Sequence, residues 1–78
     1  MNDWQMKENK LERNYEFEDF NEALEFVNKV GGLAEEEGHH PDILLYGYNK
    51  VKITLTTHDK GFKVTEKDLK LAKKIDEI

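Results

Sequence analysis

Three histidines give this chain its most direct capacity for proton chemistry. His39 and His40 are adjacent and are followed by Pro41, and His58 ends the segment VKITLTTH. Imidazole titrates at about pH 6.5, so at neutral pH it can both donate and accept a proton. Two imidazoles on opposite sides of one pocket could therefore act as the acid and the base of a proton-transfer reaction.

The same residues also have purely structural interpretations. A histidine in a loop is usually a solvated surface residue, and His58 could simply end a strand. Asp68 could serve only to cap a helix together with Thr65. Glu35 is one of three consecutive glutamates and could lie on a solvated helix face. Residue patterns alone leave these alternatives open.

The composition excludes several kinds of site. The chain contains neither cysteine nor serine, so thiolate catalysis, cysteine-bound metals and a serine nucleophile are ruled out. Three histidines and a carboxylate could bind zinc. However, adjacent histidines rarely reach one tetrahedral ion together, and no HxH or HxxxH spacing occurs. We therefore predict neither a metal nor a cofactor.

Charge and hydropathy argue against nucleic-acid and membrane partners. The net charge is −5, and lysines alternate with glutamates without forming a basic block. A nucleic-acid site needs a cationic stripe, so we expect none. No apolar run approaches the roughly 20 residues of a membrane span, and the first ten residues lack the apolar centre of a signal peptide. We expect a cytoplasmic protein.

Two strands are predicted at the start of the chain. Residues 3–8 (DWQMKE) alternate weakly, and residues 10–19 (KLERNYEFED) alternate well. In the second segment Leu11, Arg13, Tyr15 and Phe17 share one side. Period-two alternation is typical of a strand with one solvated face, and ENK between the segments predicts a hairpin turn.

A long helix should follow. Asp19 is typical of an N-cap, and Glu22 three residues later resembles a capping box. The apolar residues at helical spacing are Phe20, Ala23, Leu24, Val27, Val30 and Ala34. They predict a helix of about 18 residues that ends just before Gly38, its C-cap glycine. Gly31 and Gly32 lie inside it and indicate a kink or a close approach of helix to sheet.

Two further strands and a second helix complete the predicted elements. DILLYGY (residues 42–48) is apolar enough for a strand, NK makes a turn, and residues 51–58 form the most regular strand. Its core face carries Val51, Ile53 and Leu55, and its other face carries Lys52, Thr54, Thr56 and His58. Thr65 should cap the last helix, with Asp68 at its third position. The apolar stripe of that helix comprises Leu71, Ala72, Ile75 and Ile78.

The predicted order is β-β-α-β-β-α, in one domain of residues 1–78. Short connections favour a four-stranded antiparallel sheet with both helices on one face, an α+β fold. In this topology His39 and His40 leave a helix C-terminus, and His58 ends a central strand. They converge only if that helix lies over or beside the strand end. Because His39 and His40 are adjacent in an irregular loop, their side chains should diverge and have different tasks.

The spacing of the candidate residues forms a longer motif. Glu35 lies one helical turn before HHP, six residues separate Pro41 from Tyr48, nine separate Tyr48 from His58, and nine separate His58 from Asp68. This pattern resembles the signature of the pterin-4a-carbinolamine dehydratases, also known as dimerisation cofactors of a homeodomain transcription factor. The segments FEDFNEALEFVNKV, YNKVKITLTTHD and TEKDLKLAKKID also resemble that family, so the resemblance covers residues 4–78.

The resemblance implies a lyase that works without cofactor or metal. It would dehydrate a 4a-hydroxytetrahydropterin to the quinonoid dihydropterin by histidine acid–base catalysis, as in tetrahydrobiopterin recycling. The implied site comprises His39, His40 and His58 as catalytic residues, Glu35 and Asp68 as supporting residues, and Pro41 and Tyr48 as substrate-binding residues. Within it, His39 and His58 would exchange protons with the substrate, while His40 would hold and orient the pterin.

The resemblance also leaves alternatives. The same fold could serve as a non-catalytic protein-binding module, or as a pterin- or molybdopterin-related binding protein. The family forms dimers and tetramers, so a homodimer or homotetramer is expected. Members usually carry an additional N-terminal helix, and this chain begins where that helix would have ended; a dimer is therefore favoured.

Overall fold

The computed structural model describes residues 4–57, 61 and 63–78, and it confirms the predicted order β-β-α-β-β-α. The elements are β1 (Gln5–Lys7), β2 (Lys10–Glu16), α1 (Phe20–Glu37), β3 (Asp42–Tyr46), β4 (Lys50–Leu55) and α2 (Glu66–Asp76). Neither helix combines the length and apolarity that crossing a membrane requires, as far as the described residues extend.

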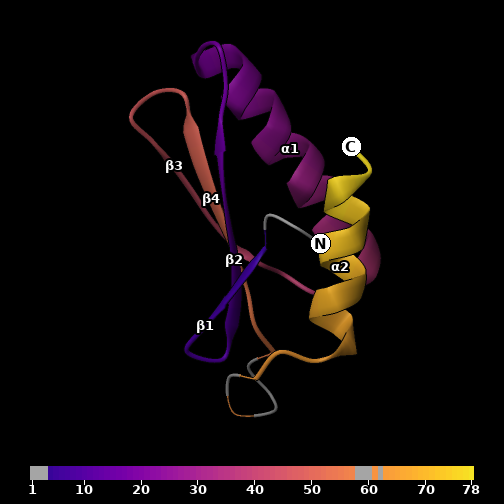
Figure 1. The fold of residues 1–78 in the computed structure, drawn as a ribbon. Helices are drawn as coiled ribbons and strands as arrows, with labels where there is room; N and C mark the ends of the chain where they lie inside the picture. Colours follow the sequence, from indigo (N-terminus) through magenta and orange to yellow (C-terminus); the bar gives the residue numbers. More distant parts are fainter. Residues whose placement is uncertain (1–3, 58–60, 62) are drawn as a thin grey trace.

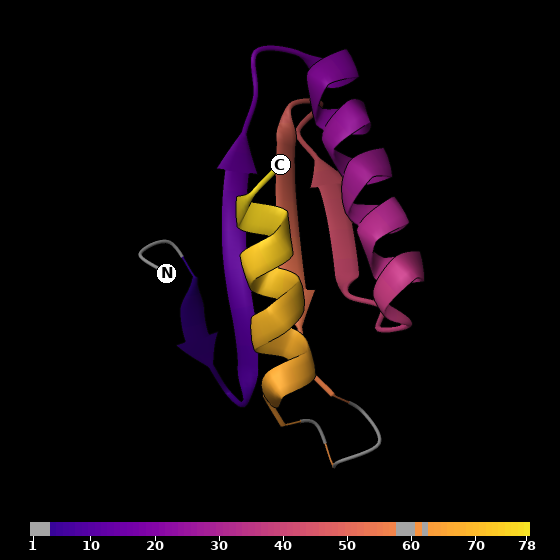
Figure 2. The same ribbon diagram turned by 90° about the vertical axis from the view of Figure 1, so that its right-hand side faces the viewer.

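The four strands form one antiparallel sheet in the order β1-β2-β4-β3. Both helices cover the same face of this sheet, as predicted (Figure 1). In Figure 2, α2 lies in front of β2 and β4, and α1 runs alongside β3. Within the described part of the chain, no helix covers the other face of the sheet, and β1 and β3 are its edge strands.

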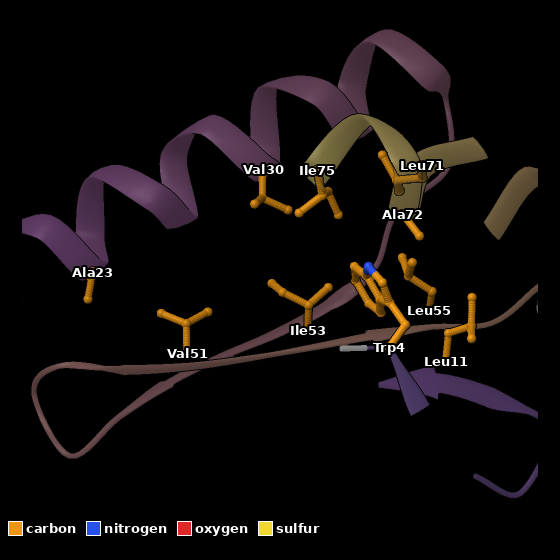
Figure 3. Packing of buried hydrophobic residues seen from close by; sticks show 10 residues of the cluster. All are labelled: Trp4, Leu11, Ala23, Val30, Val51, Ile53, Leu55, Leu71, Ala72 and Ile75. Carbon is orange, nitrogen blue, oxygen red and sulfur yellow. The ribbon is translucent and has the colours of Figure 1, made fainter. Parts of the chain in front are cut away.

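The hydrophobic core lies between the helices and β4. The fully buried residues of β4 alternate along the strand: Val51, Ile53 and Leu55 are 0% exposed. They face α1 and α2, together with Leu11 of β2 and with Trp4 (Figure 3). Period-two burial of this kind is what a strand with one buried face requires, and it confirms the predicted core face of β4.

The β3–β4 turn differs from the prediction. Residues 42–48 were expected to be extended up to an Asn-Lys turn, but β3 ends at Tyr46 and the turn comprises residues 47–49. Gly47 and Tyr48 both have positive φ angles, of 55° and 57°. Glycine adopts such an angle without steric cost, so the chain reverses at Gly47 rather than at the following Asn-Lys pair.

The strand after this turn is also shorter than predicted. β4 ends at Leu55, and Thr56 is 3% exposed instead of projecting from the solvated face. Its hydroxyl donates a hydrogen bond to the backbone carbonyl of Asn9, in the β1–β2 turn. A buried hydroxyl requires such a partner, and a partner from a distant turn is not visible in a local pattern.

The apolar face of α1 differs from the predicted stripe at two residues. Phe20 and Leu24 are 50% and 38% exposed, whereas Ala23, Val30 and Ala34 are buried. Val27 of the predicted stripe packs against the core, and so do Phe26 and Leu33. The difference from the prediction is therefore confined to Phe20 and Leu24. Ile78, predicted in the stripe of α2, is 49% exposed because it lies beyond the end of that helix.

The two glycines inside α1 do not mark a close approach of helix to sheet. An ideal Cβ built at Gly31 or Gly32 would have no heavy atom of the described chain within 4 Å, apart from adjacent residues and the helix backbone itself. The predicted explanation by close approach is therefore wrong. The glycines cost helix stability without a compensating contact among the described residues.

Replacing Gly32 with alanine is expected to increase the free energy of unfolding by about 0.5–1 kcal/mol, because alanine orders the helix at no steric cost. Urea denaturation followed by circular dichroism measures this change. Gly38→Ala is the matched control. Gly38 has a φ of 63°, so alanine there should destabilise the protein. A loss of stability in Gly32→Ala would show that the position is constrained.

Candidate functional site

The ends of three secondary-structure elements lie together at one end of the molecule. The C-terminus of α1, the end of β4 and the N-terminus of α2 lie together at the lower end of Figure 2. The β3–β4 turn lies at the opposite end. The loop that carries His39 and His40 leaves α1 at the lower end, so the first pair of histidines is brought next to α2.

The C-cap of α1 fixes the direction of His39. Gly38 adopts a left-handed conformation with φ 63° and ψ 29°. The Gly38 N–H donates to the Glu35 carbonyl, and the His39 N–H donates to the Ala34 carbonyl. This pair of bonds is the Schellman arrangement, which closes a helix and reverses the chain. The backbone of His39 is thereby tied to the last turn of α1.

The N-cap of α2 positions Asp68. The Thr65 backbone N–H donates to Asp68 Oδ2 at 2.9 Å, and the Thr65 side chain caps the first turn in return. This capping box confirms the structural role predicted for Asp68. It uses only one oxygen of the carboxylate, however, so the second oxygen remains available for another partner.

That second oxygen faces His39. Asp68 Oδ1 lies 2.5 Å from His39 Nε2, and Asp68 Oδ2 also accepts a hydrogen bond of 2.7 Å from the Thr57 hydroxyl. The carboxylate of Asp68 is 0% exposed, and the imidazole of His39 is 12% exposed. The capping role and the imidazole contact are therefore not alternatives, because each oxygen of Asp68 serves one of them.

The hydrogen-bond roles indicate which nitrogen of His39 is available for chemistry. Asp68 sits opposite three groups that can donate: a backbone N–H, a hydroxyl and an imidazole nitrogen. The two oxygens of a carboxylate can accept from all three of these groups. In the tautomer whose Nε2–H donates to Oδ1, Nδ1 is the ring nitrogen that remains as an acceptor for another partner.

His40 points to a different helix. Its Nε2 lies 2.5 Å from Oε2 of Glu35, in the last turns of α1. Both side chains are exposed, at 63% and 77%. The two adjacent imidazoles thus diverge, as expected: His39 contacts a buried carboxylate of α2 and His40 an exposed carboxylate of α1. Their environments suit different tasks.

A second link joins the helices beside this site. Glu37, the last residue of α1, lies 3.1 Å from Lys74 Nζ and 3.4 Å from Lys70 Nζ, both on α2. The hydrogen bond from Lys74 lowers the pKa of Glu37 below its usual value, and Lys70 adds to the effect. The same contact raises the pKa of Lys74. These ion pairs hold the C-terminus of α1 against α2.

The Glu37 contacts predict a pH-dependent stabilisation. A lowered carboxyl pKa stabilises the fold above the unfolded value of about 4.3, and the effect is lost as pH falls through the lower folded value. Glu37→Gln should therefore be less stable than wild type at pH 7, and the difference should shrink as the pH falls below the usual carboxyl pKa. Urea midpoints across this range measure it.

Glu25 offers the control for that experiment, since it is exposed on α1 and no ion pair of it is found within the described residues. Glu25→Gln should show little dependence of its stability difference on pH. A Glu37→Gln deficit that stays constant from pH 7 to pH 3 would contradict an ion-pair origin.

The remaining predicted site residues lie in three different situations. Pro41 is partly buried directly after the histidine pair. Tyr48 is 64% exposed in the β3–β4 turn, which the length of β3 separates from the histidine loop by about 16 Å. The structure therefore does not bring Tyr48 to His39 within one chain. His58 lies outside the described residues.

Thr57 and Lys63, which flank the loop between β4 and α2, are paired with each other beside the site. Thr57 and Lys63 form an isolated antiparallel bridge, with Thr57 N–H donating to the Lys63 carbonyl at 2.8 Å. The Thr57 hydroxyl contacts the same carboxylate as His39. The residue next to position 58 is thus a direct neighbour of the His39–Asp68 pair.

Thr57 is a site residue that pattern reading missed. The predicted alternation of residues 51–58 places it on the core face, where Val51, Ile53 and Leu55 are apolar. A hydroxyl on that face requires a buried hydrogen-bond partner, and this was the available signal. The partner itself, Asp68, could not be identified without the tertiary structure.

Two further observations describe what this end of the molecule can hold. A hollow of about 270 Å³ opens beside the network and is lined by Thr57, Thr65, Glu66 and Lys67. Across the described residues, no three histidine or carboxylate side chains gather as a metal-ligand set. The described network consists of hydrogen bonds that converge on the carboxylate of Asp68 next to His39.

Comparison with known proteins gives consistent matches. A model of the family described as pterin 4 alpha carbinolamine dehydratase matches residues 1–78. A Sulfurisphaera tokodaii protein, provisionally named a pterin-4-alpha-carbinolamine dehydratase, is 50% identical over 78 residues, covering 100% of this chain and 82% of the relative.

Solved structures agree with this assignment. A crystal structure described as a transcriptional coactivator/pterin dehydratase from Brucella melitensis superimposes with a TM-score of 0.86 at 36% identity, covering 95% of this chain and 79% of that one. A pterin dehydratase-like protein identified as a RuBisCO assembly factor in the alpha-carboxysome has a TM-score of 0.73 at 28% identity, covering 95% and 83%. With the family model matched along its whole length and relatives half identical to it, this chain belongs to the pterin 4 alpha carbinolamine dehydratase family.

Proposed function

We propose that the protein dehydrates 4a-hydroxytetrahydropterins to quinonoid dihydropterins, with His39 as one of its proton-transfer groups. The observation that carries this proposal is the buried pair of His39 and Asp68, with Nε2 and Oδ1 2.5 Å apart. A hydrogen-bonded carboxylate holds an imidazole in one tautomer and supports its charged form. Family membership supplies the substrate class.

The proposed reaction needs only proton transfers. The C4a–O bond breaks, and the hydroxyl leaves as water once an acid has protonated it. The neighbouring ring nitrogen loses its proton to a base, and its electrons form the new C=N bond. Atoms and charges balance without a redox partner or a covalent intermediate. General acid–base assistance of this kind typically contributes roughly 10²–10⁴-fold.

The individual roles follow the contacts. His39 offers Nδ1 to the substrate, because Nε2 faces Asp68. His58 is proposed as the second proton-transfer group, and its neighbour Thr57 supports this by contacting the same carboxylate. His40 is proposed to hold the pterin, and Glu35 orients its ring. Pro41, directly after the two loop histidines, is proposed to shape the wall of the pterin pocket. The same role was expected for Tyr48, but Tyr48 lies in the β3–β4 turn, at the far end of β3 from His39.

The direct test is dehydration of a synthetic pterin carbinolamine by the purified protein, followed by the absorbance of the quinonoid product. Several carbinolamines that differ in the side chain of the pterin ring should be compared, because membership in the family does not select one pterin. Acceleration above the uncatalysed rate is expected. A rate equal to that of buffer for every pterin would refute the proposal.

The second candidate function is a non-catalytic protein-binding role. It is supported by the descriptions of the two comparison structures. One is described as a coactivator and the other as a RuBisCO assembly factor. Exposed Phe20 and Leu24 on α1 give this chain an apolar surface that a protein partner could contact. A binding module should tolerate loss of its histidines, so a variant with all three replaced by alanine separates the two functions.

A further inference from the structure

Thr57 links three groups at the centre of the site. It is 2% exposed, and its hydroxyl oxygen lies 2.7 Å from Asp68 Oδ2 and 2.7 Å from Thr65 Oγ1. Its backbone N–H donates to the Lys63 carbonyl, and its carbonyl accepts from the Lys63 N–H. The side chain therefore projects from a fixed point of the backbone into a buried polar network.

The direction of each hydrogen bond in this network follows from the number of protons available. The Lys67 backbone N–H donates to Thr65 Oγ1, so the oxygen of Thr65 is already an acceptor. Each hydroxyl has one proton to donate. Because Thr57 donates to the carboxylate, the Thr65 hydroxyl donates to Thr57. A chain of donors thus runs from the first turn of α2 to Asp68 Oδ2.

We propose that Thr57 is a positioning residue for the dehydration, acting on His39 through Asp68. Its hydroxyl and the Thr65 N–H both occupy Oδ2, so Oδ1 is left as the acceptor for His39 Nε2. This keeps the imidazole proton on Nε2 and directs Nδ1 outward. The inference rests on the proposed function for its effect on rate, but its effect on the His39 tautomer can be measured without substrate.

The adjacent residue provides a matched comparison. Thr56 is 3% exposed, and its hydroxyl donates to the Asn9 carbonyl rather than to the site. Thr56→Val and Thr57→Val each remove one buried hydroxyl from neighbouring positions in the same segment. A general loss of stability should be common to both, whereas a change at His39 should occur only in Thr57→Val.

The decisive measurement is the ¹H–¹⁵N NMR signature of His39 in the free protein, assigned with the help of His39→Gln. In the wild type, Nε2 should carry the proton and Nδ1 should be unprotonated in the neutral ring. In Thr57→Val the Nε2–H resonance should weaken and the other tautomer should appear. Thr57→Ser, which keeps the hydroxyl, should restore the wild-type signature, and Thr56→Val should leave it unchanged.

Kinetics then connect this signature to the reaction. Thr57→Val should lower kcat for carbinolamine dehydration roughly tenfold, equivalent to about 1.4 kcal/mol, with KM little changed, and Thr57→Ser should recover most of it. The inference is overturned if the His39 signature is the same in Thr57→Val as in wild type, or if Thr57→Ser fails to restore it. If Thr57→Val changes the His39 tautomer but the wild-type protein has no dehydratase activity, the coupling is supported and the proposed function is refuted.

Discussion

His39→Ala is expected to lower kcat for carbinolamine dehydration by roughly 10²–10⁴-fold, the usual contribution of a positioned acid or base. The imidazole is 12% exposed and held against a fully buried carboxylate, so no other side chain of the described network can replace its Nδ1. Because the carbinolamine also loses water unaided, rates must be corrected for the uncatalysed reaction. Initial-rate measurements at pH 7 give this comparison.

His40→Ala is the natural control, because the neighbouring ring is 63% exposed and is paired with Glu35, which is also exposed. If it mainly holds the pterin, its loss should raise KM more than it lowers kcat. His58→Ala should resemble His39→Ala if both exchange protons with the substrate. Full rates in both His39→Ala and His58→Ala would refute the assignment.

Asp68→Ala is expected to produce the largest loss of stability, about 3–5 kcal/mol, the usual cost of removing one partner from a buried charged network. Three groups would lose their acceptor: the Thr65 N–H, the Thr57 hydroxyl and His39 Nε2. A domain of this size has only a small margin of stability. The variant should therefore be partly unfolded at room temperature, which urea denaturation or thermal melting would show.

Asp68→Asn separates the catalytic effect from the structural one. The amide keeps the size of the side chain and one oxygen to cap α2. If that oxygen accepts from Thr65 and Thr57, the amide nitrogen faces His39 and donates to Nε2, which forces the ring proton onto Nδ1. The rate should then fall at least a hundredfold while most of the protein remains folded.

Asp76→Asn is the corresponding control at the other end of α2. Asp76 accepts hydrogen bonds from Arg13 and from the Trp4 indole, so its loss should reduce stability without changing the rate of the folded protein. An Asp68→Asn variant that is folded and fully active would contradict the role given to the Asp68–His39 pair.

Much of the fold was predictable because its signals are local. Alternation at residues 10–17 and 51–55, the caps at Asp19 and Thr65, and Gly38 after the long helix each describe a few neighbouring residues, and the structure confirms them. The predictions were wrong where contacts with distant parts of the chain determine which side chains are buried. Thr56 is buried and bonds to a distant turn. α1 packs on the core through Phe26, Val27 and Leu33, which leaves Phe20 and Leu24 exposed.

The candidate site divides in the same way. By itself the sequence determined the residue types, their spacing and the family they indicate, together with the cap that Asp68 forms with Thr65. Only the tertiary structure showed that Asp68 both caps α2 and contacts His39, because its two oxygens face different partners and a cap motif describes only one of them. It also brought Thr57 into the site and placed Tyr48 at the far end of β3 from His39 and His40. Contacts across 29 residues, such as His39 to Asp68, exist only once the sheet and both helices are packed together.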